Sequence, residues 1–393
     1  MKEVGIYIHI PFCVKKCYYC DFVSYPDKLD CQKEYIEKLK QEICEESDIL
    51  KNVNVTTIYI GGGTPSLIDS KYIIEILECL YKYIGRKERE ITIEINPGTV
   101  TKEKLKNYKR VGINRISIGL QSSSDRILKT IGRIHNFQEF LEAYNLIVDE
   151  GFENINVDLM LGLPEQTIED LKQSIKEVLN LKLKPKHISI YSLIVEENTP
   201  LDKMLENKEI NLPDDEYERE QYAYVKNMLE LNGYNHYEIS NFAKKGYESK
   251  HNVNCWKQKD YIGFGVAAHS YLDGIRFSNT NILREYINNQ KFSLPIKEDL
   301  IGKKLPIKSG VKTIHELQSQ KDKENEYMLL GLRMIDGVSI SEFKNKFIDN
   351  PIYLYHEKLE KLVNAGLIEI DLDNIKLTRK GLDLANIVWE EFV

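Results

Sequence analysis

Residues 7–20 read YIHIPFCVKKCYYC, an apolar, β-branched run that leads directly into Cys13, Cys17 and Cys20. Cysteine thiolates are the usual ligands of iron–sulfur clusters, and three on one short loop can surround a single inorganic centre. A cluster of four irons needs four ligands, so this loop would leave one iron open to an exogenous ligand. Phe22 stands where another cysteine could complete the set. Structural zinc competes with this interpretation, although zinc prefers four closed protein ligands.

Outward from this loop, residues 1–240 alternate strand-like and helix-like segments. Six short apolar runs are predicted as strands, at 4–10, 55–60, 90–95, 114–120, 154–161 and 187–193. Amphipathic stretches predicted as helices lie at 32–46, 67–84, 102–110, 137–150, 167–179 and 215–231. This alternation predicts an α/β fold with a parallel sheet and helical crossovers. Periodicity alone does not separate an incomplete barrel from an open sheet.

Glycine-rich and polar residues follow five of these strands, as in the GGGTP sequence of residues 61–65 and the NPG sequence of residues 96–98. In parallel sheets and barrels, ligands bind at the carboxyl ends of the strands. Loops of this kind commonly collect Gly and Pro, but these loops also carry Cys, Thr, Glu and Gln. We therefore expect the ligand site at this edge of the sheet.

The composition changes beyond the sixth predicted strand. We divide the chain into a core at 1–240, a His- and aromatic-rich extension closing the barrel mouth at 241–290, a connector at 291–323 and a C-terminal domain at 324–393. The last of these is predicted as helices plus a two-stranded hairpin, an arrangement like a winged helix. Residues 311–393 carry 11 Lys and Arg against 15 Asp and Glu, so the basic face of a nucleic-acid-binding domain is absent.

The composition as a whole narrows the class of protein. The 393 residues include seven cysteines and have a formal net charge of −7, which argues against general nucleic-acid or anionic-membrane binding. An odd number of cysteines cannot all form disulfides. The chain has no apolar run of 18 residues and does not begin like a signal peptide. We expect a cytoplasmic protein that is not an integral membrane protein.

The cysteine loop followed by GGGTP resembles the radical S-adenosylmethionine (SAM) superfamily, in particular the branch that contains coproporphyrinogen III dehydrogenases and HemW-type haem chaperones. The resemblance covers essentially the whole chain. It implies a partial (β/α)6 barrel with a small helical, winged-helix-like C-terminal domain. It also implies a [4Fe–4S] cluster on Cys13, Cys17 and Cys20, with SAM bound to the fourth iron.

The resemblance further assigns residues to SAM binding. We expect exposed backbone amides of Gly62, Gly63 and Thr64 to meet the amino-acid moiety of SAM. Glu94 is expected to face the barrel interior, because its neighbours in the strand point to the other face. Asp158 lies in an otherwise apolar strand, where a carboxylate needs a partner or ligand. The other assigned positions are Tyr7, Tyr19, Gln121, Arg133 and Ser192. Arg133 could equally be a solvated base at a helix end.

Two activities compete within this branch. An oxygen-independent coproporphyrinogen III oxidase would use a SAM-derived radical to convert two propionates to vinyls, whereas a haem chaperone would bind haem and transfer it to acceptor proteins. The oxidase carries an extra cysteine two residues past the triad and a long N-terminal arm. This chain has Phe22 there and 12 residues ahead of Cys13, so we favour the chaperone. A binding module with a vestigial cluster is a third possibility, and whether the protein is an enzyme stays open.

The HNxxYW motif of the haem chaperones appears here as HNVNCW, residues 251–256. We expect His251 to ligate or orient haem, and Trp256 to form an apolar wall. A structural histidine in a polar loop is the alternative. Cys255 replaces the tyrosine of the motif and is a third candidate, because haem iron accepts His or Cys. The remaining histidine candidates are His9, which alternates with isoleucines in a strand, and His269.

The resemblance implies haem as a partner, together with an acceptor protein that the sequence does not identify. A reductant such as flavodoxin or ferredoxin would supply electrons to the cluster. We expect no nucleic-acid partner.

Overall fold

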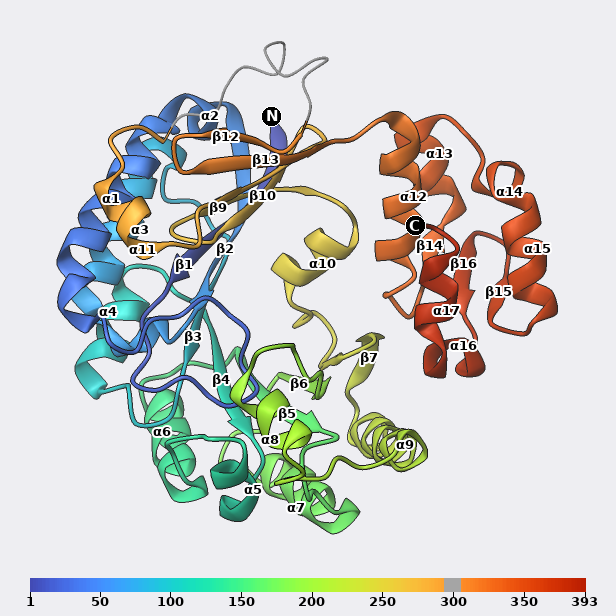
Figure 1. Cartoon of the computed structure of the whole chain (residues 1–393), viewed down its shortest axis with the longest axis horizontal. Helices are drawn as coiled ribbons and strands as arrows, with labels where there is room; N and C mark the ends of the chain where they lie inside the picture. The colour runs from blue at the N-terminus through green and yellow to red at the C-terminus, as the bar shows by residue number, and fades with distance from the viewer. Residues whose placement is uncertain (293–304) are drawn as a thin grey trace.

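The computed structural model describes residues 1–292 and 305–393 and is organised around one large sheet (Figure 1). Thirteen strands in the described ranges follow the order β12-β13-β11-β10-β9-β1-β2-β3-β4-β5-β6-β8-β7. Its parallel centre comprises β1 (Lys2–Ile10), β2 (Val53–Gly62), β3 (Glu90–Ile95), β4 (Arg115–Gln121), β5 (Ile155–Leu161) and β6 (His187–Ser192). Among the described residues the sheet ends in the strands β12 and β7 and does not close, so the predicted six-unit incomplete barrel is confirmed.

Helices connect the parallel strands and cover one face of the sheet (Figure 1). The major ones are α1 (Gln32–Glu45), α3 (Ser70–Ile84), α4 (Lys102–Arg110), α6 (Phe137–Asp149), α7 (Ile168–Leu179) and α9 (Asp215–Leu231). Shorter helical segments are η1 (Leu29–Cys31), α2 (Ser47–Asn52), η2 (Pro65–Leu67), α5 (Asp125–Thr130) and α8 (Pro200–Glu206). Local signals set several of the boundaries; Asn136 and Glu139, for example, form a capping box at the start of α6.

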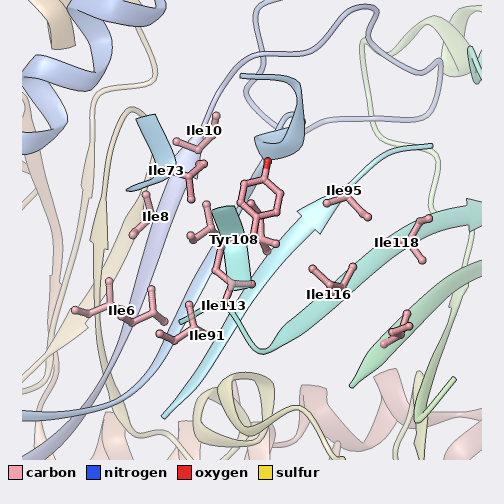
Figure 2. Close-up of a cluster of buried hydrophobic side chains, with 14 of the residues drawn as sticks. Ile6, Ile8, Ile10, Ile73, Ile91, Ile95, Tyr108, Ile113, Ile116 and Ile118 are labelled. Atoms are coloured by element: carbon pink, nitrogen blue, oxygen red, sulfur yellow. The ribbon is translucent and has the colours of Figure 1, made fainter. Parts of the chain in front are cut away.

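The two faces of the sheet differ because successive strand residues point to opposite sides. On β1, Ile6, Ile8 and Ile10 are fully buried and point toward the helices, whereas Tyr7 and His9 point to the concave face. Figure 2 shows the isoleucines of β1, β3 and β4 gathered with side chains from α3 and α4. The apolar face therefore holds the sheet to its helices, and the concave face is left for polar groups.

The His- and aromatic-rich segment extends the sheet at both ends. The strand β7 (Asn235–Glu238) immediately precedes this segment. The elements of the segment are β8 (Asn241–Ala243), α10 (Lys250–Trp256), β9 (Asp260–Phe264), β10 (His269–Leu272), β11 (Ile275–Asn279) and α11 (Leu283–Asn288). The strand β9 pairs in parallel with β1, and β10 and β11 continue the sheet antiparallel. The predicted connector 291–323 lies partly outside the described residues. Its described part contains β12 (Ile307–Ser309) and β13 (Lys312–Leu317), which also join this sheet.

The C-terminal region forms a separate lobe with its own apolar core (Figure 1). It contains α12 (Gln320–Gly331), β14 (Val338–Ser339), α13 (Ile340–Phe347), α14 (Pro351–Leu354), α15 (His356–Asn364), β15 (Ile368–Ile370), β16 (Asn374–Leu377), α16 (Arg379–Asp383) and α17 (Ala385–Glu390). The predicted helices and hairpin are present, and β14 adds a third strand beside β16. In the described residues, no helix combines the length and apolarity that a membrane crossing requires.

Candidate functional site

A cavity of about 380 Å³ opens on the concave face at the carboxyl ends of the parallel strands. All three cysteines of the loop line it. Eight of the ten residues assigned to SAM line the same cavity, namely Tyr19, Gly62, Gly63, Thr64, Glu94, Gln121, Arg133 and Asp158. The fold thus brings together residues from six parts of the chain, and we call this space the first cavity.

Backbone hydrogen bonds hold the cysteine loop in place. The amide of Cys20 donates to the carbonyl of Cys17 at 3.2 Å. The amide of Tyr18 donates to the carbonyl of Ile131, and the carbonyl of Tyr18 accepts from the amide of Leu201. All three cysteines are free thiols. Burial, and then repulsion from the neighbouring Cys17, raises the pKa of Cys20 to about 11. The thiol protons must therefore be displaced when a metal centre binds.

The three cysteines of the loop do not converge on a single point. Within residues 1–292 and 305–393, no three His, Cys, Asp or Glu side chains converge closely enough to hold one metal ion. A cubane binds each thiolate through a different iron, so its cysteines need not converge on one point.

The glycines of the GGGTP loop are required by close packing. Gly62 has a φ of 116°, and a Cβ there would lie 2.7 Å from the His9 ring. A Cβ on Gly63 would lie 2.7 Å from the carbonyl oxygen of Phe12. Only glycine allows this backbone conformation and approach, so the loop lies directly against the chain that leads into the cysteines.

The amides of this loop are already engaged within the protein, and the contact of Gly62, Gly63 and Thr64 with SAM stays a prediction. The amides of Gly62, Gly63 and Thr64 all donate within the protein, at 3.1, 2.9 and 2.7 Å. Their acceptors are the Glu94 carboxylate and the carbonyls of Ile10 and Phe12. The Glu94 side chain, the pairing with β1 and the chain entering the Cys loop each engage one of these donors, so the loop shapes the cavity without supplying free N–H groups.

Glu94 faces the interior, as its strand position predicts. Its carboxylate accepts hydrogen bonds from the Tyr59 hydroxyl at 2.8 Å and from the amide of Gly62 at 3.1 Å. Burial raises the pKa of Glu94 to about 7; repulsion from Asp158 adds to this and the Tyr59 hydrogen bond opposes it. A carboxyl group whose pKa lies near 7 suits a cationic ligand group, because the positive charge of the ligand would favour the ionised carboxylate.

Arg133 connects three walls of the first cavity. Its Nη1 atom lies 3.7 Å from the Cys17 sulfur, and Nη2 donates to Asn96 Oδ1 and to the carbonyl of Gly119, both at 2.8 Å. Asn96 in turn donates to the Thr64 hydroxyl at 2.8 Å. The Arg133 Nε atom is buried and has no partner among the described residues. Arg133 is thus an interior group, not a solvated helix-end base.

Asp158 finds partners on its own strand β5 and on the neighbouring strand β4, as a carboxylate inside a sheet must. It accepts from Asn156 Nδ2 at 2.7 Å and from the Ser117 hydroxyl at 3.2 Å. Burial raises its pKa, against the opposing effect of these hydrogen bonds. A second acid with a raised pKa thus lies on the concave face with Glu94.

Two predicted SAM residues lie outside the first cavity. Tyr7 lines a neighbouring cavity, where its hydroxyl is 2.9 Å from His9 Nδ1. Ser192 lies exposed at the end of β6, and its neighbour Tyr191 lines the first cavity instead. Tyr59, Asn96 and Tyr191 were missed by sequence reasoning. The strand alternation that places Glu94 inward could have identified Tyr59, which lies inward on the adjacent strand.

A second cavity, of about 770 Å³, lies on the same concave face. Phe22 lines both cavities. Four histidines line the second one, His9, His251, His269 and His315, together with Cys255. His315 was not among the sequence candidates, because nothing in its local sequence marks it.

His251 is buried in the wall of the second cavity and held by two strands. Its Nδ1 atom is 2.9 Å from the Thr57 hydroxyl, and its backbone amide donates to Glu90 at 3.1 Å. Its ring packs against that of Tyr59, with centroids 5.2 Å apart. Nε2 has no hydrogen-bond partner within the described ranges. Burial, then the nearby Arg115, lowers the pKa of His251 to about 4, so the imidazole is neutral at pH 7.

The other predicted haem contacts have different surroundings. Both ring nitrogens of His9 are engaged, with Tyr7 and with the carbonyl of Val23 at 2.8 Å. Burial raises the pKa of Cys255 to about 11, which keeps it a neutral thiol. Trp256 lines neither cavity; it lies against the C-terminal lobe, with the Arg333 guanidinium 4.5 Å from its ring. His251 therefore lines the second cavity, and Trp256 does not.

Comparison with known proteins identifies the family. A family model described as the radical SAM superfamily matches residues 7–178, and one described as the HemN C-terminal domain matches residues 318–384. A Lactococcus lactis protein named "Heme chaperone HemW" is 35% identical over 100% of this chain and 98% of its own length. The chain belongs to the HemW family of radical SAM proteins.

Other comparisons agree with this membership. The HemW protein of Bacillus subtilis is 36% identical, covering 98% of both chains. The structure of coproporphyrinogen III oxidase from Escherichia coli, described as a radical SAM enzyme, superposes with a TM-score of 0.81 over 100% of this chain and 90% of that chain. Because the Escherichia coli oxidase is only 21% identical, its structure shows the shared fold alone.

The chain fits the cofactors of its superfamily, a [4Fe–4S] cluster and SAM. Cys13, Cys17 and Cys20 would hold the cluster, and the unpaired Nε of Arg133 and the carboxylate of Glu94 are available to the charged ends of SAM. When bound, the cluster and SAM together supply one-electron chemistry. The protein residues themselves orient the ligands and, through Arg133, place a positive charge beside a cysteine ligand.

Proposed function

We propose that this protein is a haem chaperone, which binds haem beside a [4Fe–4S] cluster and SAM and passes the haem to an acceptor protein. The observation that carries the proposal is His251, a buried and neutral imidazole whose Nε2 atom is unpaired at the wall of the second cavity. Full-length relatives bear the name "Heme chaperone HemW", which agrees with this assignment.

The second cavity has suitable dimensions for this cargo. Its volume of about 770 Å³ falls in the range of roughly 300–1,000 Å³ that is typical of small-molecule and cofactor sites. Haem iron is already held by four porphyrin nitrogens and needs only axial ligands, for which a neutral imidazole is a common choice. His251 is the candidate ligand.

The protein positions His251 before any cargo binds. Ser249 caps the N-terminus of α10 through the amide of Asn252, and Glu90 accepts from the amides of Lys250 and His251. The Thr57 hydroxyl engages Nδ1, so Nε2 remains for the iron. A metal-bound histidine commonly makes such a contact through its other ring nitrogen, which fixes the ring orientation.

The two cavities suggest a link between the cluster site and the haem site. Phe22, which replaces the extra cysteine of the oxidase, is 63% exposed and lines both cavities. We propose that the acceptor is a protein reached from this face, and that a flavodoxin or ferredoxin reduces the cluster. A cytoplasmic location is part of the same proposal.

A haem titration of the purified full chain tests the proposal, with and without reconstituted cluster. We expect a saturable shift of the Soret band, and at least a tenfold weaker affinity for His251→Ala. His356→Ala is the matched control, because His356 lies at the start of α15 in the C-terminal lobe. Absence of saturable haem binding in either state would overturn the proposal.

The oxidase is the runner-up, and a second assay addresses it. The reconstituted protein is incubated anaerobically with coproporphyrinogen III, SAM and a reductant, and the products are examined for vinyl groups. We expect no vinyl formation. Robust turnover without saturable haem binding would assign the protein to the oxidase activity instead.

A further inference from the structure

Three histidines of the second cavity lie at different depths. His251 is buried, whereas His269 and His315 are exposed. They come from different parts of the fold: His251 from α10, His269 from β10 and His315 from β13. The cavity therefore has an inner imidazole and an outer pair of imidazoles.

The outer pair comes from β10 and β13, which both pair with the strand β11. The rings of His269 and His315 stack with centroids 6.0 Å apart and an interplanar angle of 18°. The Ser278 hydroxyl lies 2.7 Å from His315 Nε2 and anchors that ring. Neither ring nitrogen of His269 has a hydrogen-bond partner within the described part of the chain. His269 thus presents free nitrogen atoms at the outer end of the cavity.

The ligand chemistry of this pair suits a metal that brings most of its own ligands. No group of three or more His, Cys, Asp or Glu side chains in the described ranges could hold a bare metal ion, so two imidazoles here make an incomplete site for one. Haem iron needs only one or two axial ligands beyond its porphyrin. A single free imidazole, supported by a second ring, is sufficient for haem.

We infer that His269, supported by His315, is a second iron-ligating station for haem at the outer end of the cavity, occupied as haem passes to and from His251. This inference rests on the proposed haem-chaperone function. The transfer is an exchange of axial ligands: the iron–nitrogen bond to His269 breaks as the bond to His251 forms, with no change in electrons or protons.

The surroundings keep His269 in the form that can ligate. Partial desolvation of the ring in the cavity, followed by repulsion from His315 and Arg276, lowers the pKa of His269. The remaining ionisable groups lining this cavity near its rim include Lys308 and Glu285, which pair with each other at 3.2 Å. His269 therefore meets the iron as a neutral imidazole.

Stopped-flow mixing of the full chain with ferric haem tests the inference through the Soret spectrum. For the wild type we expect two phases, a fast association and a slower change of axial ligand. The double variant H269A/H315A is expected to lose the fast phase and to associate at least fivefold more slowly, yet to reach the same final spectrum. His251→Ala is expected to keep the fast phase and stop there, in a weaker complex.

Controls separate this inference from the proposed function. His356→Ala should behave as the wild type, and thermal unfolding should show that each variant is folded. If H269A/H315A binds haem with the same two phases as the wild type, the outer station does not exist, whereas haem binding through His251 still stands. If neither the wild type nor any variant binds haem, the proposed function itself is wrong.

Discussion

The Nη1 atom of Arg133 lies 3.7 Å from the sulfur of Cys17, although 116 residues separate the two in the chain. The same guanidinium bonds Asn96 and the carbonyl of Gly119. One side chain thus ties the cysteine loop to the ends of two strands. It also places a fixed positive charge where a cysteine thiolate must form.

Arg133→Ala should therefore weaken SAM binding by the reconstituted protein by about tenfold to a hundredfold, the usual effect of losing charged hydrogen bonds. Cluster iron content should fall as well, because the charge beside Cys17 is lost. Equilibrium dialysis with labelled SAM and iron analysis measure the two effects. Arg126→Ala is the control, since Arg126 is an exposed residue paired with Asp170. Equal SAM affinity in both variants would contradict the prediction.

Glu94 should make the protein less stable as the pH rises toward neutrality. Its folded-state pKa of about 7 lies above the ordinary glutamate value, so the folded state holds a proton that the unfolded state has lost. This contribution is present below pH 4 and is lost by about pH 8, with a magnitude on the order of 3 kcal/mol.

Urea unfolding of the cluster-free chain between pH 5 and pH 8 measures this effect. Glu94→Gln cannot ionise, so its free energy of unfolding should fall less over the same range. Burial also raises the pKa of Asp158, which leaves a residual slope of the same sign in the variant. An identical pH dependence in both proteins would show that Glu94 is ionised at all of these pH values.

Thr57 is predicted to act on haem through His251. Thr57→Val removes the hydroxyl that lies 2.9 Å from Nδ1 and should weaken haem binding by about twofold to tenfold. A changed EPR signal of the bound ferric haem would distinguish a reoriented imidazole from a merely destabilised protein.

Thr92→Val provides a matched control on the adjacent strand. The Thr92 hydroxyl is buried and has no partner among the described residues. Its removal should leave haem affinity unchanged and should not lower stability. If both variants lost haem affinity equally, the contact between Thr57 and His251 would not be the cause.

Trp256 is predicted to fix the C-terminal lobe to the helix α10. The Arg333 guanidinium lies 4.5 Å from the Trp256 ring and 4.7 Å from that of Trp389. Trp256→Ala and Arg333→Ala should each destabilise this contact, by about 2 kcal/mol for the tryptophan, and should leave haem affinity within about twofold. Limited proteolysis between the lobes measures the loosening, with Arg379→Ala as control. A large loss of haem binding in Trp256→Ala would restore its predicted role as a haem wall.

Local patterns predicted the parallel part of the fold closely. The helices α4 and α9 and the strand β3 have the predicted bounds, because their periodicity and their capping residues lie within each segment. The inward direction of Glu94 followed from strand alternation in the same way. The strands β9 to β13 were missed, because they are short and are stabilised by pairing with distant strands.

The sequence by itself determined the cysteine loop, the glycine loop, the six alternating strand–helix units and the family. All of these depend on residue types at short spacing. Only the tertiary structure decided which residues share a cavity. It placed Tyr7 beside the second cavity, used the amides of the glycine loop internally and moved Trp256 to the lobe interface. It also brought His315 beside His269, because the pairing of β13 with β11 is a long-range contact that no local pattern encodes.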